Sequence, residues 1–260
     1  MAKSEPKEPK EPSLLTSVRA IKLALFEPIL GSAPGNPELY REYIAGKAPP
    51  VPDAETKASK TEEEVATLPP FDVEAQIEKA STVFHRDKQG LFLYDYQLKG
   101  FFKEALLTLI NVGLCPVSKW TLKKAVDGYV FIAQRRVYLL KPDGSNYDKA
   151  DSTLSRPLRA ETMQGERTTL ANSELLPGGT ILNFTMGLLL GQGKAKAQSL
   201  TGEHIEAALT YGSAKGLGQW RSGSYGRFTW EEGEVDNSVY DLPNFAMFKL
   251  ARQMQKKNGE

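Results

Sequence analysis

The sequence predicts an α+β fold in which an antiparallel sheet carries helices on one face. Two segments alternate apolar and polar residues with the period of a half-buried strand, and two others repeat apolar residues at helical spacing. The chain has 260 residues, of which 40% are hydrophobic and 25% charged, so these elements can bury one sizeable core. This composition excludes a fibrous, disulfide-stapled or wholly disordered protein.

The first strand is expected within residues 17–30, where Ile21, Leu23 and Leu25 alternate with alanine and lysine. Pro28 ends this strand or places it at an edge. Residues 31–37 (GSAPGNP) are typical of a turn, after which residues 37–45 predict a short helix that begins at proline. Residues 47–70 are rich in Pro, Ala, Thr, Glu and Lys, and this polar composition predicts a mobile insertion.

The remaining elements follow in a regular order. A helix is predicted over 96–109, strands over 128–140 and 180–190, a helix capped by Thr201 over 201–211, and a strand over 227–230. These elements are expected to share one core with the first strand. The core residues that they contribute are Leu98, Phe102, Ala105, Leu106, Leu109, Leu182, Phe184, Met186, Leu188, Ile205, Ala208 and Leu209. This order predicts a ferredoxin-like, or RRM-like, sheet with insertions.

Residues 14–250 are expected to form this single domain, between a disordered tail at 1–13 and a basic tail at 251–260. The N-terminus lacks the apolar core of a secretory signal, and the longest apolar run, 181–190, is too short to span a membrane. The chain has one cysteine, Cys115, and two histidines, so neither a disulfide nor a zinc site is expected. We therefore expect a cytoplasmic protein without metal or other cofactor.

The most distinctive segment is the glycine loop GLGQWRSGSYGRF, residues 216–228. Together with the preceding Lys215, it combines glycines, cations and aromatic residues without a single acid. The candidate binding residues are Lys215, Gly216, Gly218, Trp220, Arg221, Gly223, Tyr225, Gly226 and Arg227. Exposed backbone N–H groups and arginines bind phosphate oxygens, and aromatic rings stack on bases. The spacing fits neither a dinucleotide fingerprint nor a P-loop. The sequence leaves two interpretations open, a nucleic-acid-binding loop and a packing turn.

Two further basic clusters favour a nucleic-acid surface, although solvated faces also look like this. Residues 119–141 contain six basic residues, including Lys123, Lys124, Arg135 and Arg136, against the one acid Asp127, a net charge of +5. The second cluster consists of Arg156, Arg159 and Arg167 in a predicted loop. Because the whole chain carries a formal charge of only +1, any polyanion must be met by such local patches.

Candidate catalytic groups are few. His85, beside Arg86 and Asp87, could act as a general base on a ribose hydroxyl. His204 is expected on a helix surface and Cys115 in the core. Glu231 and Glu232 are neighbours on a strand and point to opposite faces, so they do not predict a hydrolase.

The order of four segments resembles the RAMP superfamily, RNA-binding proteins that build CRISPR effector complexes, and its backbone-subunit branch in particular. The segments are VRAIKLALFEPILGS (18–32), VFHRDKQGLFLYDYQLKGFFKEALLTL (83–109), RPLRAETMQGERTTLANSELLPGGTILNFTM (156–186) and EHIEAALTYGSAKGLGQWRSGSYGRF (203–228). The resemblance covers most of residues 17–232 outside the 47–70 insertion. The ordering is also similar to that of single proteins from phages and prophages.

The resemblance implies a non-catalytic protein that binds single-stranded RNA, or DNA, and assembles with its own copies or with other subunits, in antiviral defence. It adds Lys99, in the Leu-Lys-Gly helix, to the expected nucleic-acid-binding residues. RNA-cleaving members have an aspartate after the first strand, whereas residues 31–37 contain no acid, so the resemblance does not imply cleavage. Two alternatives remain: a metal-independent ribonuclease that uses His85, and a phage structural or partner-binding protein that uses the fold as a scaffold.

Overall fold

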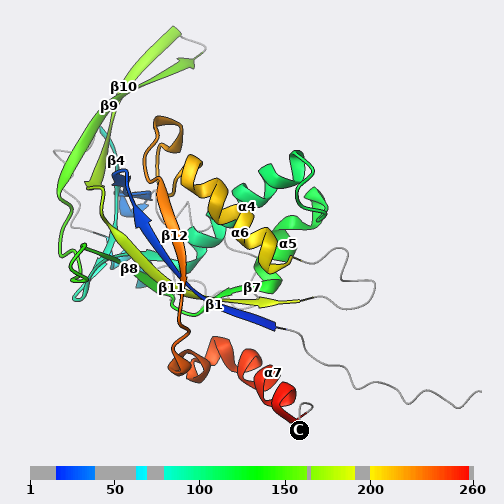
Figure 1. The fold of residues 1–260 in the computed structure, drawn as a ribbon. Helices are drawn as coiled ribbons and strands as arrows, with labels where there is room; N and C mark the ends of the chain where they lie inside the picture. Colours follow the sequence, from blue (N-terminus) through cyan, green and yellow to red (C-terminus); the bar gives the residue numbers. More distant parts are fainter. Residues whose placement is uncertain (1–15, 39–62, 69–78, 163–164, 191–199, 258–260) are drawn as a thin grey trace, which may run out of the picture.

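The computed structural model describes residues 16–38, 63–68, 79–162, 165–190 and 200–257 (Figure 1). The strands are β1 (Thr16–Leu25), β2 (Ile29–Leu30), β3 (Ala33–Pro34), β4 (Lys79–Val83), β5 (His85–Asp87), β6 (Gly90–Tyr94), β7 (Val130–Ile132), β8 (Arg136–Leu140), β9 (Ser152–Thr162), β10 (Gly165–Leu176), β11 (Ile181–Leu189) and β12 (Phe228–Gly233). The α-helices are α4 (Asp95–Asn111), α5 (Lys119–Tyr129), α6 (Gly202–Lys215) and α7 (Ala246–Lys257). Short 3-10 turns occupy Arg221–Gly223, Asn237–Asp241 and Pro243–Phe245.

The main sheet has the strand order β12-β1-β11-β8-β6-β5, with β7 also paired to β11, and its neighbouring strands are antiparallel. Along the chain, β1, α4, β8, β11, α6 and β12 follow one another as strand, helix, strand, strand, helix, strand. This succession, with its spatial order β12-β1-β11-β8, is that of a ferredoxin-like fold. The predicted α+β class is therefore confirmed.

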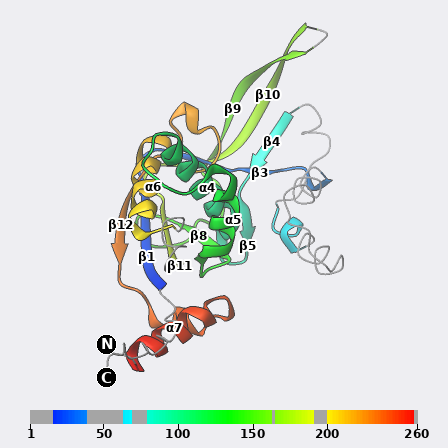
Figure 2. The ribbon, with the colours of Figure 1, turned by 90° about the vertical axis from the view of Figure 1, so that its right-hand side faces the viewer.

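The core lies between this sheet and the layer formed by α4, α5 and α6, which Figure 2 shows on one side of the strands. Ile21 and Leu23 of β1 lie opposite Phe184 and Leu182 of β11, and all four are buried. The apolar faces predicted for both helices join the same cluster, through Leu98, Phe102, Ala105, Leu106, Leu109, Ile205, Ala208 and Leu209. Strand alternation and helical spacing thus placed these residues correctly.

A second sheet, of order β2-β10-β4-β3 with β9 paired to β10, stands beside the first. Strands β9 and β10 form a long antiparallel ribbon that projects away from the rest of the molecule (Figures 1 and 2). Their base lies close to the chain that follows β1, because β2 pairs with the end of β10. The segment around Arg156, predicted as a loop, is therefore strand.

The strand predicted over 128–140 is interrupted. Helix α5 continues to Tyr129, and residues 133–135 then separate β7 from β8. At the break the Gln134 side chain accepts a hydrogen bond from the Thr185 backbone N–H at 2.9 Å, while Ala133 N–H donates to Thr185 O at 2.9 Å. A side chain thus replaces one backbone partner of the ladder, which the apolar pattern does not reveal.

Parts of the predicted basic tail and of the predicted mobile insertion are folded. Residues 251–257, expected as a basic tail, are the second half of α7, where Ala251 is fully buried. Residues 63–68, at the end of the predicted insertion, bury Glu64, Thr67 and Leu68, because ion pairs and hydrogen bonds neutralise their polar groups. The tail at 1–13, residues 47–62 and 69–70 of the insertion, and the helix predicted over 37–45 from position 39 onward lie outside the described residues.

Helix α7 contacts the other face of the sheet. Phe245 and Phe248 pack in a separate cluster with Val18 of β1 and Leu189 of β11, two positions that alternate with the residues of the main core. This cluster closes one end of the sheet face that α4, α5 and α6 leave open.

Candidate nucleic-acid interface

The glycine loop joins the end of α6 to β12 and folds back on itself. Gly216 ends α6 with a φ of 89°, and Leu217 N–H donates to Gly226 O at 2.8 Å. Gly226 N–H in turn donates to Pro28 O at 2.7 Å, which fastens the loop to the chain after β1. The loop is therefore held by backbone hydrogen bonds at both of its ends.

Close backbone contacts explain two of the loop's glycines. A Cβ atom on Gly216 would lie 2.2 Å from Tyr225 O, and one on Gly226 would lie 1.8 Å from Leu217 O. Both residues also have φ in the left-handed region, which side chains disfavour. These glycines therefore serve the packing of the loop, as the packing-turn interpretation expects.

The aromatic residues of the loop form a stack with an arginine from the ribbon. The rings of Trp220 and Tyr225 are stacked with centroids 5.1 Å apart, and Gly223 lies against the indole, since a Cβ there would be 2.8 Å from the ring. The Arg156 guanidinium of β9 lies over the indole, with Cζ 4.5 Å from the ring centroid. Two of the sequence-predicted groups, the loop and the second basic cluster, thus meet through Arg156.

Arg156 is the unusual cation of this site. Its exposed fraction is 9%, and no hydrogen bond or ion pair joins its side chain to any part of the chain that the structure describes. Nε is buried without a partner, and burial lowers the pKa of the guanidinium while neighbouring Tyr225 raises it. A buried charge is normally paired, so this guanidinium has unused capacity for an anion.

The other cations of the loop are occupied to different degrees. Arg221 Nη2 lies 2.5 Å from Glu104 Oε2 of α4, an acid that the sequence did not associate with the loop. Arg227 Nε donates to Ala214 O at 2.9 Å and so satisfies a carbonyl in the last turn of α6. Lys215 has no ion pair within the described residues. The fold therefore supplies the acid that the loop itself lacks.

Arg159 and Arg167 lie further along the ribbon than Arg156. In the register of β9 and β10, Arg156 pairs with Ala171, Arg159 with Thr168 and Arg167 with Ala160. Arg159 and Arg167 therefore stand at consecutive levels of the ribbon, and Arg156 lies three residues nearer its base.

The first basic cluster separates into two parts. Lys119, Lys123 and Lys124 are exposed on α5, whereas Arg135 and Arg136 enter ion pairs with acids from distant segments. Arg135 lies 2.9 Å from Glu64. The charges of Arg135 and Arg136 are therefore balanced by these acids, and only the lysines of this stretch keep the charge counted in the sequence.

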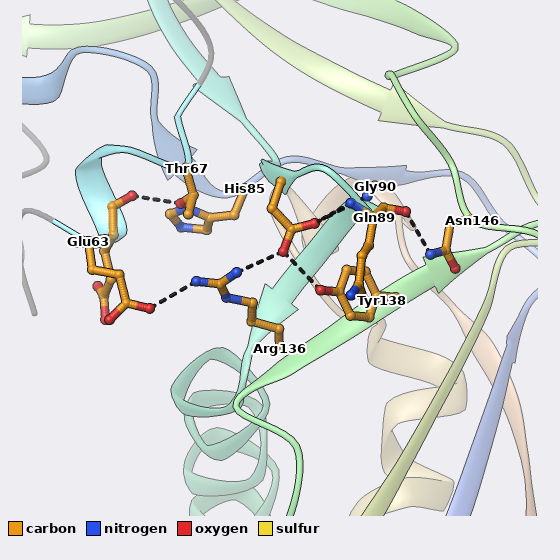
Figure 3. Close-up of polar contacts among 10 residues, drawn as sticks. Glu63, Thr67, His85, Gln89, Gly90, Arg136, Tyr138 and Asn146 are labelled. Atoms are coloured by element: carbon orange, nitrogen blue, oxygen red, sulfur yellow. Dashed lines mark hydrogen bonds and ion pairs between the residues drawn. The ribbon is translucent and has the colours of Figure 1, made fainter.

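Figure 3 shows the network around Arg136. Its guanidinium bridges Glu63 at 2.9 Å and Asp87 at 2.8 Å, and the Tyr138 hydroxyl also donates to Asp87 at 2.8 Å. Burial alone would raise the pKa of Asp87, but hydrogen bonds from the backbone N–H groups of Gln89 and Gly90, from Tyr138 and from Arg136 outweigh it and lower that pKa. This network makes Arg136 a structural residue.

His85 lies inside the same region and is fully buried. Its Nδ1 is 2.7 Å from the Thr67 hydroxyl, which donates to Glu64 O at 2.6 Å, so the imidazole Nδ1–H is the donor toward Thr67. Burial, reinforced by Arg136, lowers the pKa of His85 to about 3. A neutral imidazole without solvent access cannot reach a ribose hydroxyl, and the ribonuclease alternative loses its proposed base.

The remaining candidates have structural positions. Lys99 is partly buried with Nζ 5.4 Å from the Phe131 ring centroid; burial lowers its pKa, and Asp95 and Asp127 act against this. His204, expected on the surface, is half-buried, and its Nδ1 accepts a hydrogen bond from Thr201 N–H at 3.1 Å at the start of α6. Cys115 is buried, as predicted.

Within the described ranges, no group of three or more His, Cys, Asp or Glu residues is arranged to hold a metal ion. Among the helices that the structure describes, none combines the length and the apolar character needed to cross a membrane.

No protein-family model matches the sequence, and no curated protein matches it either. Among solved structures, the fold is similar to a chain of a "Type IV-B CRISPR Complex", with a TM-score of 0.40 and 10% sequence identity over 84% of this chain and 91% of that chain. This is a distant similarity of fold alone.

Proposed function

We propose that the protein is a non-catalytic nucleic-acid-binding protein, in which the glycine loop and the base of the ribbon bind the backbone of a single strand. The observation that carries this proposal is Arg156, a nearly buried guanidinium with neither a carboxylate nor a hydrogen-bond partner in the described chain. A phosphate offers such a guanidinium two acceptor oxygens and neutralises its charge.

The neighbours of Arg156 suit a nucleic acid better than a free anion. Trp220 lies beside the guanidinium and is 38% exposed, and the ring of Tyr225 stacks on the indole. The exposed part of the indole, which already contacts Arg156, Tyr225 and Gly223, gives a nucleotide bound at the phosphate site an apolar edge to pack against. Lys215, at the end of α6, adds a charge without an ion pair in the described chain.

The finer features of the proposal are the preference for RNA and a place in a multisubunit assembly of the CRISPR-associated, antiviral kind. They are supported by the resemblance of the four sequence segments to RAMP backbone subunits. The ferredoxin-like fold is compatible with them but hosts many functions.

A partner-binding or scaffold protein is the second candidate. It is favoured by the packing of Gly216 and Gly226 against backbone and by the ion pair of Arg221 with Glu104. On this view the loop only fixes α6 to β12, and the protein has no affinity for nucleic acid.

Binding of labelled single-stranded RNA and DNA, about 20 nucleotides long, distinguishes the two candidates by fluorescence anisotropy. Arg156→Ala should weaken binding by about tenfold or more, because a charge-assisted hydrogen bond to phosphate is lost. The matched control is Arg221→Ala in the neighbouring glycine loop, which removes a cation already paired with Glu104 and should change affinity by less than about twofold.

Arg156→Lys should recover part of the affinity, since an ammonium keeps the charge without the bidentate geometry. Undiminished affinity of a folded Arg156→Ala variant would remove this site from nucleic-acid binding. Absence of any binding by the unaltered protein at low salt would favour the scaffold.

A further inference from the structure

A second cationic surface lies on α5, away from the glycine loop. Trp120 is 93% exposed, the highest exposure among the large hydrophobic residues that the structure describes as exposed. Lys119, Lys123 and Lys124 are exposed on the same helix. Because positions three and four apart are neighbours on a helix, the indole shares one face with Lys123, Lys124 and Asp127, opposite the buried Leu122, Ala125 and Val126, and Lys119 lies beside this face.

The three lysines have no counter-charge. Within the described residues none of them takes part in an ion pair, in contrast to Arg135 and Arg136. The only acid of α5 is Asp127, whose carboxylate lies 2.5 Å from Lys103 Nζ of α4. Asp127 lies on the same face as Lys123 and Lys124, but Lys103 balances its charge, so the three lysines keep theirs.

The exposed indole points to a ligand with flat faces. Trp120 has no ring or cation contact within the described chain, so both of its faces are open. A tryptophan that docks into a folded protein partner needs apolar neighbours around it. Val112 and Leu114, in the turn before α5, are also exposed, but the helix face that carries Trp120 is otherwise charged, with Lys123, Lys124 and Asp127. An open indole among lysines matches the combination of base stacking and phosphate contact used for single strands.

The position of α5 would allow one nucleic-acid strand to contact both the glycine loop and this helix. Helix α4 lies between α6 and α5 in the helix layer, and Arg221 of the glycine loop is paired with Glu104 of α4 (Figure 2). Packed helices are about 8–10 Å apart, so the α5 face is separated from the loop side by about two helix spacings. A strand of several nucleotides covers such a distance.

We infer that Trp120, Lys123 and Lys124 form a second contact for the same single-stranded nucleic acid, with the indole stacked on a base and the ammonium groups beside phosphates. This inference rests on the proposed function and extends its binding surface to α5.

The test uses the full chain and the same oligonucleotides, with affinity measured over a range of salt concentrations. Trp120→Ala should weaken binding by about tenfold, with an unchanged salt dependence, because stacking involves no counterion release. Lys123→Glu/Lys124→Glu should weaken binding and reduce the slope of log affinity against log salt by about 1.4, about 0.7 for each phosphate contact to a single strand. All of these side chains are exposed, so the thermal unfolding of the variants should match that of the unaltered protein.

The matched control is Lys88→Glu/Lys149→Glu, which makes the same change in net charge at two exposed lysines elsewhere. A smaller loss of affinity in this control than in the α5 variant supports a local contact. If both α5 variants bind like the control while Arg156→Ala is weakened, the inference is overturned and the proposed function stands.

If the unaltered protein binds no oligonucleotide, the proposed function and this inference are both wrong. An α5 variant that changes only the oligomeric state in light scattering would instead identify a protein-docking surface and would also overturn the inference.

Discussion

The region around Arg136 and the region around Arg156 both contain buried or half-buried arginines, yet they are stabilised differently. Arg136 sits between Glu63 and Asp87, and its neighbours are joined by a network of side-chain hydrogen bonds (Figure 3). Arg156 meets only an aromatic ring, in a region held together by backbone contacts of the glycine loop. A buried arginine is therefore available to a ligand only where the fold has not already placed an acid beside it.

The two regions should therefore respond to different perturbations. The glycine-loop region should be sensitive to added side-chain volume and the Arg136 region to pH and charge. Three substitutions test this contrast, in order of decreasing effect on stability.

Gly226→Val should destabilise the protein most. The added Cβ would lie 1.8 Å from Leu217 O, in a residue whose φ is 71°. Adding the penalty of a left-handed conformation to that of overpacking gives a loss of about 2–5 kcal/mol in the free energy of unfolding. Urea denaturation measures it.

Gly128→Ala in α5 is the control, because nothing lies within 4 Å of its Cβ position. It should be neutral or stabilising by up to about 1 kcal/mol, since alanine favours a helix. Equal stabilities of the Gly226→Val and Gly128→Ala variants would contradict the backbone packing described for the loop.

Acidification should destabilise the Arg136 region through His85. Burial, with Arg136, lowers the pKa of His85 from 6.5 to about 3, so below pH 6.5 the unfolded chain binds a proton that the folded chain does not. The stabilising contribution is complete above pH 6.5 and is lost as the pH falls toward 3. Each pH unit costs about 1.4 kcal/mol, or about 2 kcal/mol between pH 6.5 and pH 5.

His85→Gln keeps a hydrogen-bonding side chain without the titration, so its stability should vary less over this pH range. Burial also lowers the pKa of His204, which leaves a smaller dependence of the same sign in the variant. Denaturant titrations at several pH values would disprove the assignment if the two proteins lost stability in parallel.

Asp87→Asn should have the smallest effect, about 1 kcal/mol near neutral pH, because Arg136 retains Glu63. The pKa of Asp87 is lowered in the folded state from its usual value of 3.8, so the ionised carboxylate stabilises the protein above pH 3.8, and this stabilisation is lost as the pH falls further. The stability difference between the two proteins should consequently shrink at pH 3. A difference that stays constant down to that pH would show that the carboxylate charge does not contribute.

Elements with a strong one-sided pattern could be predicted from the sequence. Strands β1 and β11 and helices α4 and α6 each bury one face deeply, so their periods are visible in the apolar residues alone. Helix α7 escaped prediction although Phe245, Phe248 and Ala251 recur at helical spacing, because the lysines that follow suggest a tail. The break between β7 and β8 depends on a side chain of Gln134 and has no periodic signal.

The site could be predicted only by residue type. Arg156 and Trp220 were both candidates, but their contact depends on where β9 runs relative to the loop. The partners of Arg221 and Arg136 are acids far away in the chain, and no local pattern announces Glu104 or Glu63. Counting charge along a segment therefore overestimates the cations that a fold leaves available.

The contact of Phe248 with Gly187 covers part of the sheet face opposite α4, α5 and α6. A Cβ at Gly187 would lie 2.4 Å from the phenyl ring, so α7 rests directly on β11. RRM modules read RNA with aromatic residues on the open sheet face. Here that face is shut at one end by α7, and on β1 it presents Ala20, Lys22 and Ala24, which alternate with the core residues. Under the proposed function, a single strand would therefore contact the glycine loop and α5, and the sheet face that RRM modules use would stay partly covered by α7.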